Sequence, residues 1–270
     1  MKNVKNKIIL VLVVSLMSIF TLYGCSNETA ETPEMDASET QQMSANLNPL
    51  TGLEIDQEKI SLRPVCVMIN NMHKGQPLFG VNRADLLYEC PIEGGITRIM
   101  SVFKDISSAD TIGSVRSARP YFIHIAKGFE SIYIHLGGSD IAYQILKSGY
   151  IDSIDLKSNE AFMWRDPERR KNLGFEHSAL TSGEKILAGI NKKGFSKELS
   201  NTSFKYNFSD NSPVLNGSDA NRLTVTFSGY KNTIFDYNKE KETYYISQFK
   251  KPQMDAMDNV QNSKPNVFVL

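Results

Sequence analysis

Short apolar runs rich in β-branched and aromatic residues recur between positions 64 and 137. Gly, Pro or Asp bounds most of them, and this pattern is typical of buried strands. The predicted strands are PVCVMIN at 64–70, LLYECPI at 86–92, ITRIMSVF at 96–103 and SIYIHLG at 131–137.

Between and after these strands, three segments show the apolar spacing and the end signals of helices. They are SARPYFIHIAKGF at 117–129, SDIAYQILKSG at 139–149 and TSGEKILAGINKKG at 181–194. Each begins at a Ser or Thr that can cap a helix, and the last two end at Gly149 and Gly194. The alternation predicts an α/β domain over residues 48–197, a mixed sheet with flanking helices.

From about residue 198 onward the pattern contains strands only. LTVTFSG at 223–229, NTIFDYN at 232–238 and TYYISQF at 243–249 alternate apolar and polar residues. The turn-like NKEKE between the last two predicts a hairpin. We therefore predict a smaller β-rich domain over residues 198–270. Because the sequence stops inside the apolar stretch PNVFVL, we expect this domain to be incomplete.

The N-terminus has the pattern of an export signal. Lys2, Lys5 and Lys7 precede an apolar run that ends at Cys25. Leu22–Cys25 resembles a lipobox, the signal at which the cysteine receives a diacylglycerol-type lipid and becomes the first residue. We predict a signal peptide at 1–24 and an anchor at Cys25. An uncleaved anchor helix and an ordinary secretory signal remain alternatives, and all three place the rest of the chain outside the cytoplasm.

The composition of the chain limits which partners and cofactors the protein is expected to bind. Residues 25–47 carry acidic but no basic side chains and few large apolar ones, which predicts a disordered acidic tether. Thirty basic and thirty acidic residues balance over the whole chain, and loss of residues 1–24 leaves a net charge of −3. We therefore do not expect the protein to bind nucleic acid.

Cys66 and Cys90 could form a disulfide, and the sequence does not decide whether they do. No Cys and His residues have the spacing of a zinc site, so we predict neither a metal nor a cofactor.

Polar residues concentrate in EGGITR at 93–98, GSVRSARPY at 113–121 and HLGGS at 135–139. Arg116 and Arg119 flank a predicted helix start at Ser117, where unpaired N–H groups favour anions. Guanidinium forks bind carboxylates and phosphates. We therefore predict an anion-binding cleft at the carboxyl ends of the strands. The candidate ligand-binding residues are Glu93, Arg98, Arg116, Ser117, Arg119, His135 and Ser139; no catalytic residue is assigned.

Three functions are compatible with these residues. The first is a membrane-tethered envelope protein that binds an anionic envelope ligand. The second is an extracytoplasmic phosphoryl or glycosyl-phosphoryl transferase, or a hydrolase, that acts on a cell-wall polymer. Its shared cleft would contain Glu93, Arg98, Arg116, Arg119 and His135. The third is a scaffold for envelope proteins, with structural arginines whose partners would be Glu89, Glu93 and Asp166.

Several segments also match a known family: RPVCVMINN at 63–71, ADLLYECPIEGGITRIMSVF at 84–103, IGSVRSARPYF at 112–122, HLGGS at 135–139 and WRD at 164–166. The sequence resembles the YerB-like exported bacterial lipoproteins, built on a domain of unknown function. This resemblance implies a lipid-anchored protein on the extracytoplasmic face of the cell membrane of a Gram-positive bacterium. The family pattern has Asp where this chain has Asn70, which removes one candidate acid, base or metal ligand. It also continues beyond residue 270.

A looser similarity links the order of elements to cell-wall polymer transferases of the LytR-CpsA-Psr type. Their motifs do not match this chain residue by residue, so the similarity is an analogy.

Overall fold

The computed structural model describes residues 46–200, 206, 208 and 217–270. The predicted signal peptide, Cys25 and nearly all of the predicted tether lie outside these residues. Within the described residues, no helix is both long and apolar enough to cross a bilayer.

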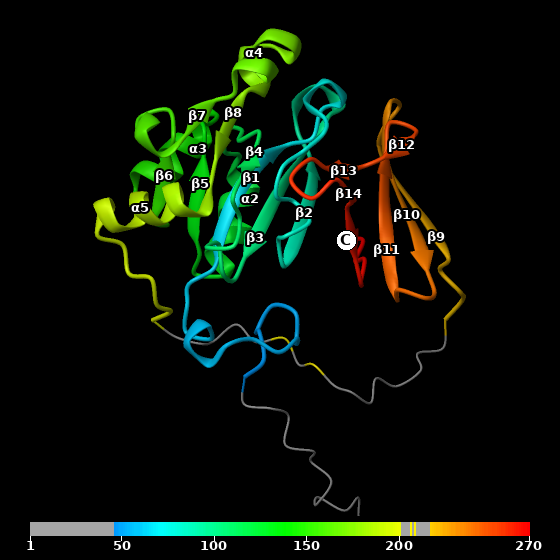
Figure 1. Ribbon diagram of the computed structural model, residues 1–270. Coiled ribbons are helices and arrows are strands. Elements are labelled where there is room, and N and C mark those ends of the chain that lie inside the picture. The colour runs from blue at the N-terminus through cyan, green and yellow to red at the C-terminus, as the bar shows by residue number, and fades with distance from the viewer. Residues whose placement is uncertain (1–45, 201–205, 207, 209–216) are drawn as a thin grey trace, which may run out of the picture. The chain divides into compact units, whose positions relative to one another are not determined.

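The main sheet is built around β1 (Val65–Asn70). β1 pairs antiparallel with β3 (Thr97–Phe103) on one edge and parallel with β5 (Ile132–His135) on the other. β2 (Leu86–Pro91) and β6 (Ser153–Asp155) complete the order β2-β3-β1-β5-β6 (Figure 1). The four predicted strands are present, and the antiparallel β3 makes the sheet mixed, as predicted.

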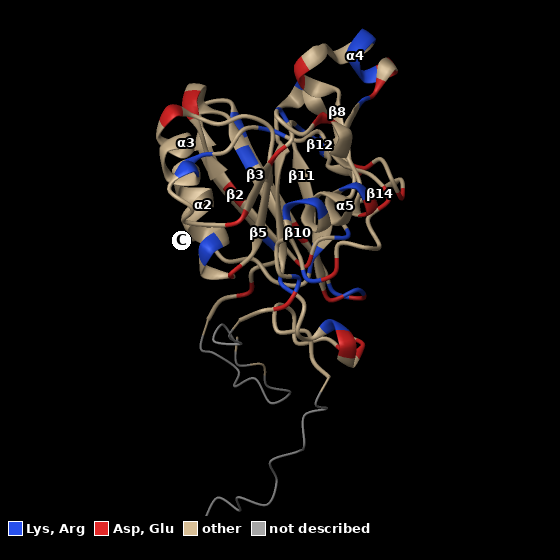
Figure 2. Cartoon of the chain, turned by 90° about the vertical axis from the view of Figure 1, so that its left-hand side faces the viewer, with Lys and Arg blue, Asp and Glu red and all other residues tan. Residues whose placement is uncertain are grey.

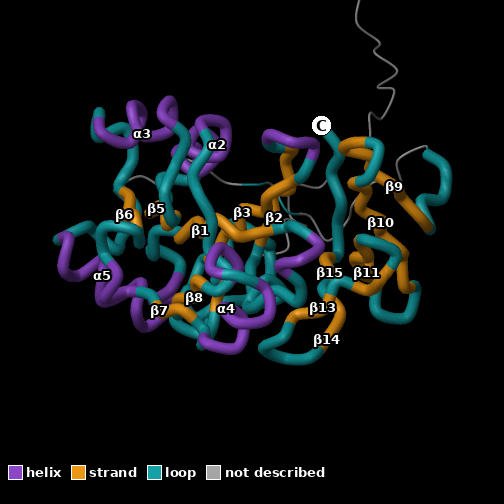
Figure 3. The backbone as a smooth tube through the Cα atoms, turned by 90° about the horizontal axis from the view of Figure 1, so that it is seen from above, coloured by secondary structure: helices purple, strands orange, loops and turns teal. Residues whose placement is uncertain are grey.

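Helices cover both faces of this sheet. α2 (Pro120–Gly128) and α3 (Asp140–Lys147) lie on one face, and α5 (Gly183–Lys193) lies on the other (Figure 3). Successive β1 side chains point to opposite faces. Met68 therefore packs in the core that contains Phe122 of α2, whereas Ile69 packs in the core that contains Ile186 of α5.

A small second sheet accompanies α5 and was not expected from the sequence. It contains β4 (Ile112–Gly113), β8 (Ala179–Thr181) and β7 (Trp164–Arg165), in that order. α4 (Pro167–Leu173) connects β7 to a 3₁₀ turn, η6 (Phe175–His177). These strands of two or three residues are too short to show a period in the sequence. The other 3₁₀ turns in the described part of the chain are η2 (Gln57–Lys59), η3 (His73–Gly75), η4 (Glu93–Gly95) and η5 (Glu160–Phe162).

Two of the three predicted helix starts follow the capping rules. The Ser139 hydroxyl accepts a hydrogen bond from the backbone N–H of Ala142, and Ser182 caps α5 in the same way. The predicted start of the first helix at Ser117 was wrong. α2 begins at Pro120, whose fixed φ suits the first helical position, and Arg119 occupies the N-cap without a side-chain cap.

The C-terminal part contains an antiparallel sheet in the order β12-β11-β10-β9, with β15 also paired to β11. Its predicted hairpin is present, with Asn238 opposite Thr243. The division from the α/β domain at residue 197 stays a prediction. The bounds are β9 (Arg222–Ser228), β10 (Lys231–Asn238), β11 (Thr243–Gln248), β12 (Lys251–Pro252), β13 (Met254–Asp255), β14 (Val260–Gln261) and β15 (Ser263–Lys264).

Cys66 and Cys90 are both free thiols. Cys66 lies opposite Val102 of β3, whereas Cys90 lies opposite Arg98, four residues away on the same strand. Four residues of strand span about 13 Å. This separation is too large for a disulfide.

A buried polar network links the main sheet to the C-terminal sheet. Glu89 of β2 accepts hydrogen bonds from the hydroxyls of Thr97 and Thr233, and its Oε1 lies 2.9 Å from Nζ of Lys231. Lys231 is almost fully buried, and this burial lowers the pKa of its ammonium group. The Glu89–Lys231 ion pair is therefore largely shielded from water.

We expect Lys231→Met to destabilise the protein by about 3–5 kcal/mol, because it leaves the Glu89 charge buried without its partner. The free energy of unfolding in urea measures this loss. The double variant Glu89→Gln/Lys231→Met removes both charges and should recover part of it. A double variant whose loss equals the sum of the losses of Lys231→Met alone and Glu89→Gln alone would contradict this account.

Candidate functional site

The carboxyl edge of the main sheet gathers polar side chains from four strands. β1, β5 and β6 are parallel, so their last residues, Asn70, His135 and Asp155, lie at the same edge. β3 runs the other way, and its second residue, Arg98, lies opposite Asn70. Two of the predicted site residues, Arg98 and His135, therefore lie at this edge of the sheet.

Arg98 is a buried arginine without a carboxylate partner among the described residues. It is 6% exposed, and its Nη1 donates a hydrogen bond of 2.6 Å to the backbone oxygen of Ser117. Burial, together with the charges of Arg119 and Arg116, lowers the pKa of its guanidinium to about 10. The group stays charged at neutral pH in surroundings that disfavour its charge.

Arg119 holds Glu93 in a two-pronged ion pair. Its Nε lies 2.7 Å from Oε1 of Glu93, and its Nη2 lies 2.7 Å from Oε2. The side chain of Glu93 is 67% exposed, and the hydrogen bonds from Arg119 lower the pKa of its carboxyl to about 2. Arg119 thus presents its fork to a carboxylate at the protein surface.

Arg116 points to a different partner. Its Nη1 donates to the backbone oxygen of Glu176 at 2.8 Å, and its Nη2 lies 3.3 Å from Oε2 of the same residue. Arg116 and Arg119 both precede the helix, so they do not share one helix face as expected. Arg98 donates to the backbone oxygen of Ser117, which lies between Arg116 and Arg119 in the chain, and the charges of both arginines act on Arg98. We call these three residues the arginine corner.

The ion pairs expected from a purely structural role are present only in part. Glu93 does pair with Arg119, but Glu89 pairs with Lys231, and Asp166 caps α4. The partner of Arg116, Glu176, was missed because it lies 60 residues away in the chain.

His135 and Ser139 have structural partners of their own. Nδ1 of His135 donates to the backbone oxygen of Gly137 at 2.8 Å, and its ring stacks on Tyr133. Burial lowers the pKa of His135. The Ser139 hydroxyl caps α3, and no hydrogen bond joins it to His135 among the described residues, so the two side chains are not arranged as a nucleophile–base pair. Ser117 contributes its backbone carbonyl to the site.

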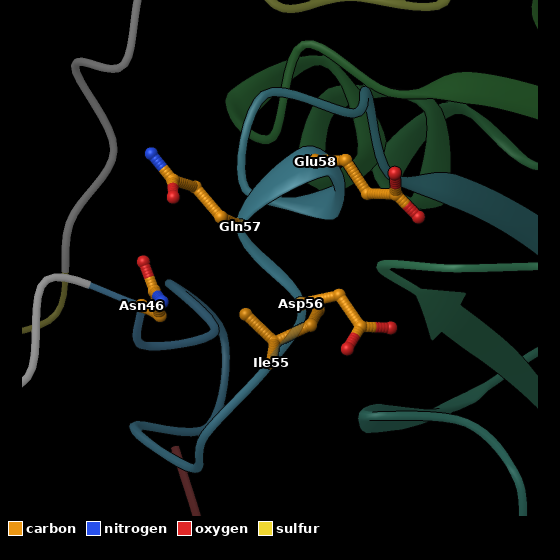
Figure 4. Close-up of a pocket in the computed structure, with 5 residues that line it drawn as sticks. All are labelled: Asn46, Ile55, Asp56, Gln57 and Glu58. Atoms are coloured by element: carbon orange, nitrogen blue, oxygen red, sulfur yellow. The ribbon is translucent and has the colours of Figure 1, made fainter.

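Two hollows lie outside the arginine corner. One of about 700 Å³ is lined by residues that precede β1, with Asp56 and Glu58 among them (Figure 4). The other, of about 600 Å³, is lined by α3 and the end of β6, where Tyr143 donates to Asp155. The seven predicted site residues line neither hollow. The described residues also contain no group of three His, Cys, Asp or Glu side chains placed to hold a metal ion.

Asn70 fixes the proton position on His177. Its Oδ1 accepts from the backbone N–H of Met72, so its Nδ2 is the donor that lies 3.0 Å from Nδ1 of His177. Nδ1 must then be the unprotonated nitrogen, and the proton sits on Nε2, 3.3 Å from Oε1 of Glu176. Burial lowers the pKa of His177, which keeps the ring neutral.

Asn70→Asp should raise the pKa of His177, because a carboxylate at this position stabilises the imidazolium. An NMR titration of the His177 ring protons measures the shift. His135, at the end of a neighbouring strand, is the internal control and should titrate as in the parent. An unchanged pKa of His177 would contradict the direct contact between residue 70 and Nδ1 of His177.

Comparisons with known proteins agree with the fold and the sequence motifs. A family model described as "Protein of unknown function (DUF3048) N-terminal domain" matches residues 50–196. "Putative lipoprotein YerB" of Bacillus subtilis (strain 168) is 31% identical over 224 residues, which cover 82% of this chain and 66% of the relative. The chain thus spans about two thirds of that relative's length.

The crystal structure of the YerB protein from Bacillus subtilis is similar to this structure, with a TM-score of 0.69 and 28% identity. The similarity covers 80% of this chain and 71% of the crystallised one. The chain belongs to the YerB-like family, whose N-terminal domain is the domain of unknown function DUF3048.

Proposed function

We propose that the protein is anchored by a lipid on Cys25 to the outer face of the cell membrane, where its arginine corner binds an anionic envelope ligand. The observation that carries the ligand part is Arg98, a buried guanidinium with no carboxylate partner in the described part of the chain. A buried charge is costly unless it is paired. Glu93 acts favourably on the charge of Arg98 but makes no ion pair with it, so an anion that enters the corner would supply the direct partner.

The pair of Arg119 and Glu93 supports the same proposal. A carboxylate already lies on the fork of Arg119 at hydrogen-bonding distance, and it is exposed. An incoming carboxylate or phosphate would meet the same donors. The planar guanidinium fork can donate two parallel hydrogen bonds and the lysine ammonium group cannot, so Arg and Lys are not equivalent at this position.

The enzymatic alternatives draw no support from a particular contact. Glu93, with a pKa of about 2, is a poor general acid at neutral pH, and His135 donates to a backbone carbonyl. A scaffold for other envelope proteins likewise has no specific contact in its favour. Binding is therefore the function that we propose.

The anchor rests on the N-terminal sequence and on the relative. Three lysines, an apolar run and the Leu22–Cys25 junction occur together, and the B. subtilis relative is named a lipoprotein. A lipid on Cys25 would place the folded part in the cell envelope, close to the membrane.

Arg116→Lys and Arg119→Lys should each weaken binding of tripolyphosphate about tenfold, because a lost charged hydrogen bond costs about 1.5–3 kcal/mol. Titration calorimetry measures the affinity. The melting temperature should change little, since Glu93 and Glu176 are exposed partners and such pairs contribute about 0–1 kcal/mol. Arg222→Lys, which alters the surface pair with Asp236, is the matched control and should keep the affinity. Destabilised variants of a parent without anion affinity would overturn the proposal.

Cys25→Ala should abolish lipid attachment, because the thiol is the acceptor of the lipid. Metabolic labelling with a palmitate analogue and membrane fractionation measure the change, and globomycin should block processing of the parent. Cys90→Ala is the control and should be labelled like the parent. A Cys25→Ala protein that is processed and membrane-bound like the parent would contradict the anchor.

A further inference from the structure

Three consecutive backbone carbonyls of η6 each accept a hydrogen bond from a different arginine. Arg165 donates to the oxygen of Phe175 at 2.7 Å, Arg116 to Glu176 at 2.8 Å, and Arg169 to His177 at 2.9 Å. The turn therefore connects the arginine corner, through Arg116, to the arginines of β7 and α4. Basic residues lie beside acidic ones along α4 (Figure 2).

The three arginines differ in how they use their other N–H donors. Arg169 is buried, and its Nη groups donate hydrogen bonds to the backbone oxygens of Pro77 and Gly75, so its role is structural. Arg165 makes one hydrogen bond and no ion pair among the described residues. Its Cζ lies 3.7 Å from the centre of the Phe175 ring, and that of Arg170 lies 5.3 Å away. Stacking by the guanidinium faces leaves their N–H edges available to a ligand.

Like charges are concentrated along this surface. The pKa of Arg165 is lowered by burial and also by the charges of Arg170 and Arg116, and Arg116 acts in the same way on Arg98. Acidic groups oppose part of this charge: Glu160 near Arg165, Glu176 bound to Arg116, Glu93 bound to Arg119 and acting on Arg98, and Asp166 near Arg169. Such repulsion destabilises the protein unless an anion relieves it.

We propose that Arg165, Arg170 and Phe175 form a second anion subsite, and that the ligand is a polymer with repeated phosphate groups that spans this subsite and the arginine corner. The inference rests on the proposed function and names the class of ligand. Repeated phosphates fit two groups of guanidinium forks joined through Arg116.

A membrane surface fits these contacts less well. Phe175 is 57% exposed, but Arg165 covers its ring at stacking distance. An aromatic ring covered by a cation is poorly placed to enter a lipid layer.

The test compares two probes, long-chain polyphosphate and tripolyphosphate, on the full folded chain by calorimetry at two salt concentrations. Arg165→Gln/Arg170→Gln should weaken binding of the long chain about tenfold and reduce the salt slope by roughly one per lost contact. Affinity for tripolyphosphate, which reaches one subsite, should stay unchanged. Lys239→Gln/Lys241→Gln, two exposed charges on the β10–β11 turn, is the matched control and should bind like the parent. If the double variant unfolds, the same comparison is made with Arg170→Gln alone, because Arg170 is exposed and its substitution should not disturb the fold.

The other outcomes separate this inference from the proposed function. Unchanged affinity for the long chain overturns the second subsite and leaves the arginine corner intact. Equal losses of affinity for both probes would indicate a single site at Arg165 and overturn the claim that one ligand spans two subsites. A parent that binds neither probe overturns the proposed function as well. Arginine-dependent binding of phosphatidylglycerol vesicles, without binding of polyphosphate, would identify a membrane as the partner and overturn the polymer.

Discussion

The pairing of β1 on both edges is the constraint on which the rest of the molecule depends. All six residues of β1 are buried, and its backbone is hydrogen-bonded to β3 and to β5. A strand so enclosed can carry polar side chains only where it leaves the core. Asn70 stands at that point, and the register with β3 brings Arg98 beside it. The arginine corner is therefore placed by the same hydrogen bonds that build the sheet.

Much of this framework could be predicted from local sequence signals. The strands around β1 were evident because each is a short apolar run bounded by turn residues. The starts of α3 and α5 were predictable because Ser139 and Ser182 are direct hydrogen-bond partners of the first turn. In these segments local preference and long-range packing agree.

The sequence singled out the arginines of the candidate site, but it did not predict the contacts that they make. Arg116 and Arg119 were expected to share a helix face, yet Pro120 sets the start of α2 and leaves both arginines before it. Arg116 finds its partner on η6, and the carbonyls of that turn bind Arg165 and Arg169. A side-chain contact to a backbone carbonyl depends on where the chain returns in space, and any residue type can supply the carbonyl. Such contacts leave no pattern in the sequence.

The buried pair of Glu89 and Lys231 has a consequence for how this family can vary. Glu89 lies on β2 and Lys231 on β10, 142 positions apart in the chain, and each is the main charge partner of the other. Loss of either charge alone would leave the remaining one stranded away from water. A substitution at one position alone therefore destabilises the protein, whereas replacement of both residues by apolar or neutral ones is tolerated. The two positions should change together across related sequences, as a correlated pair that records the contact between the sheets.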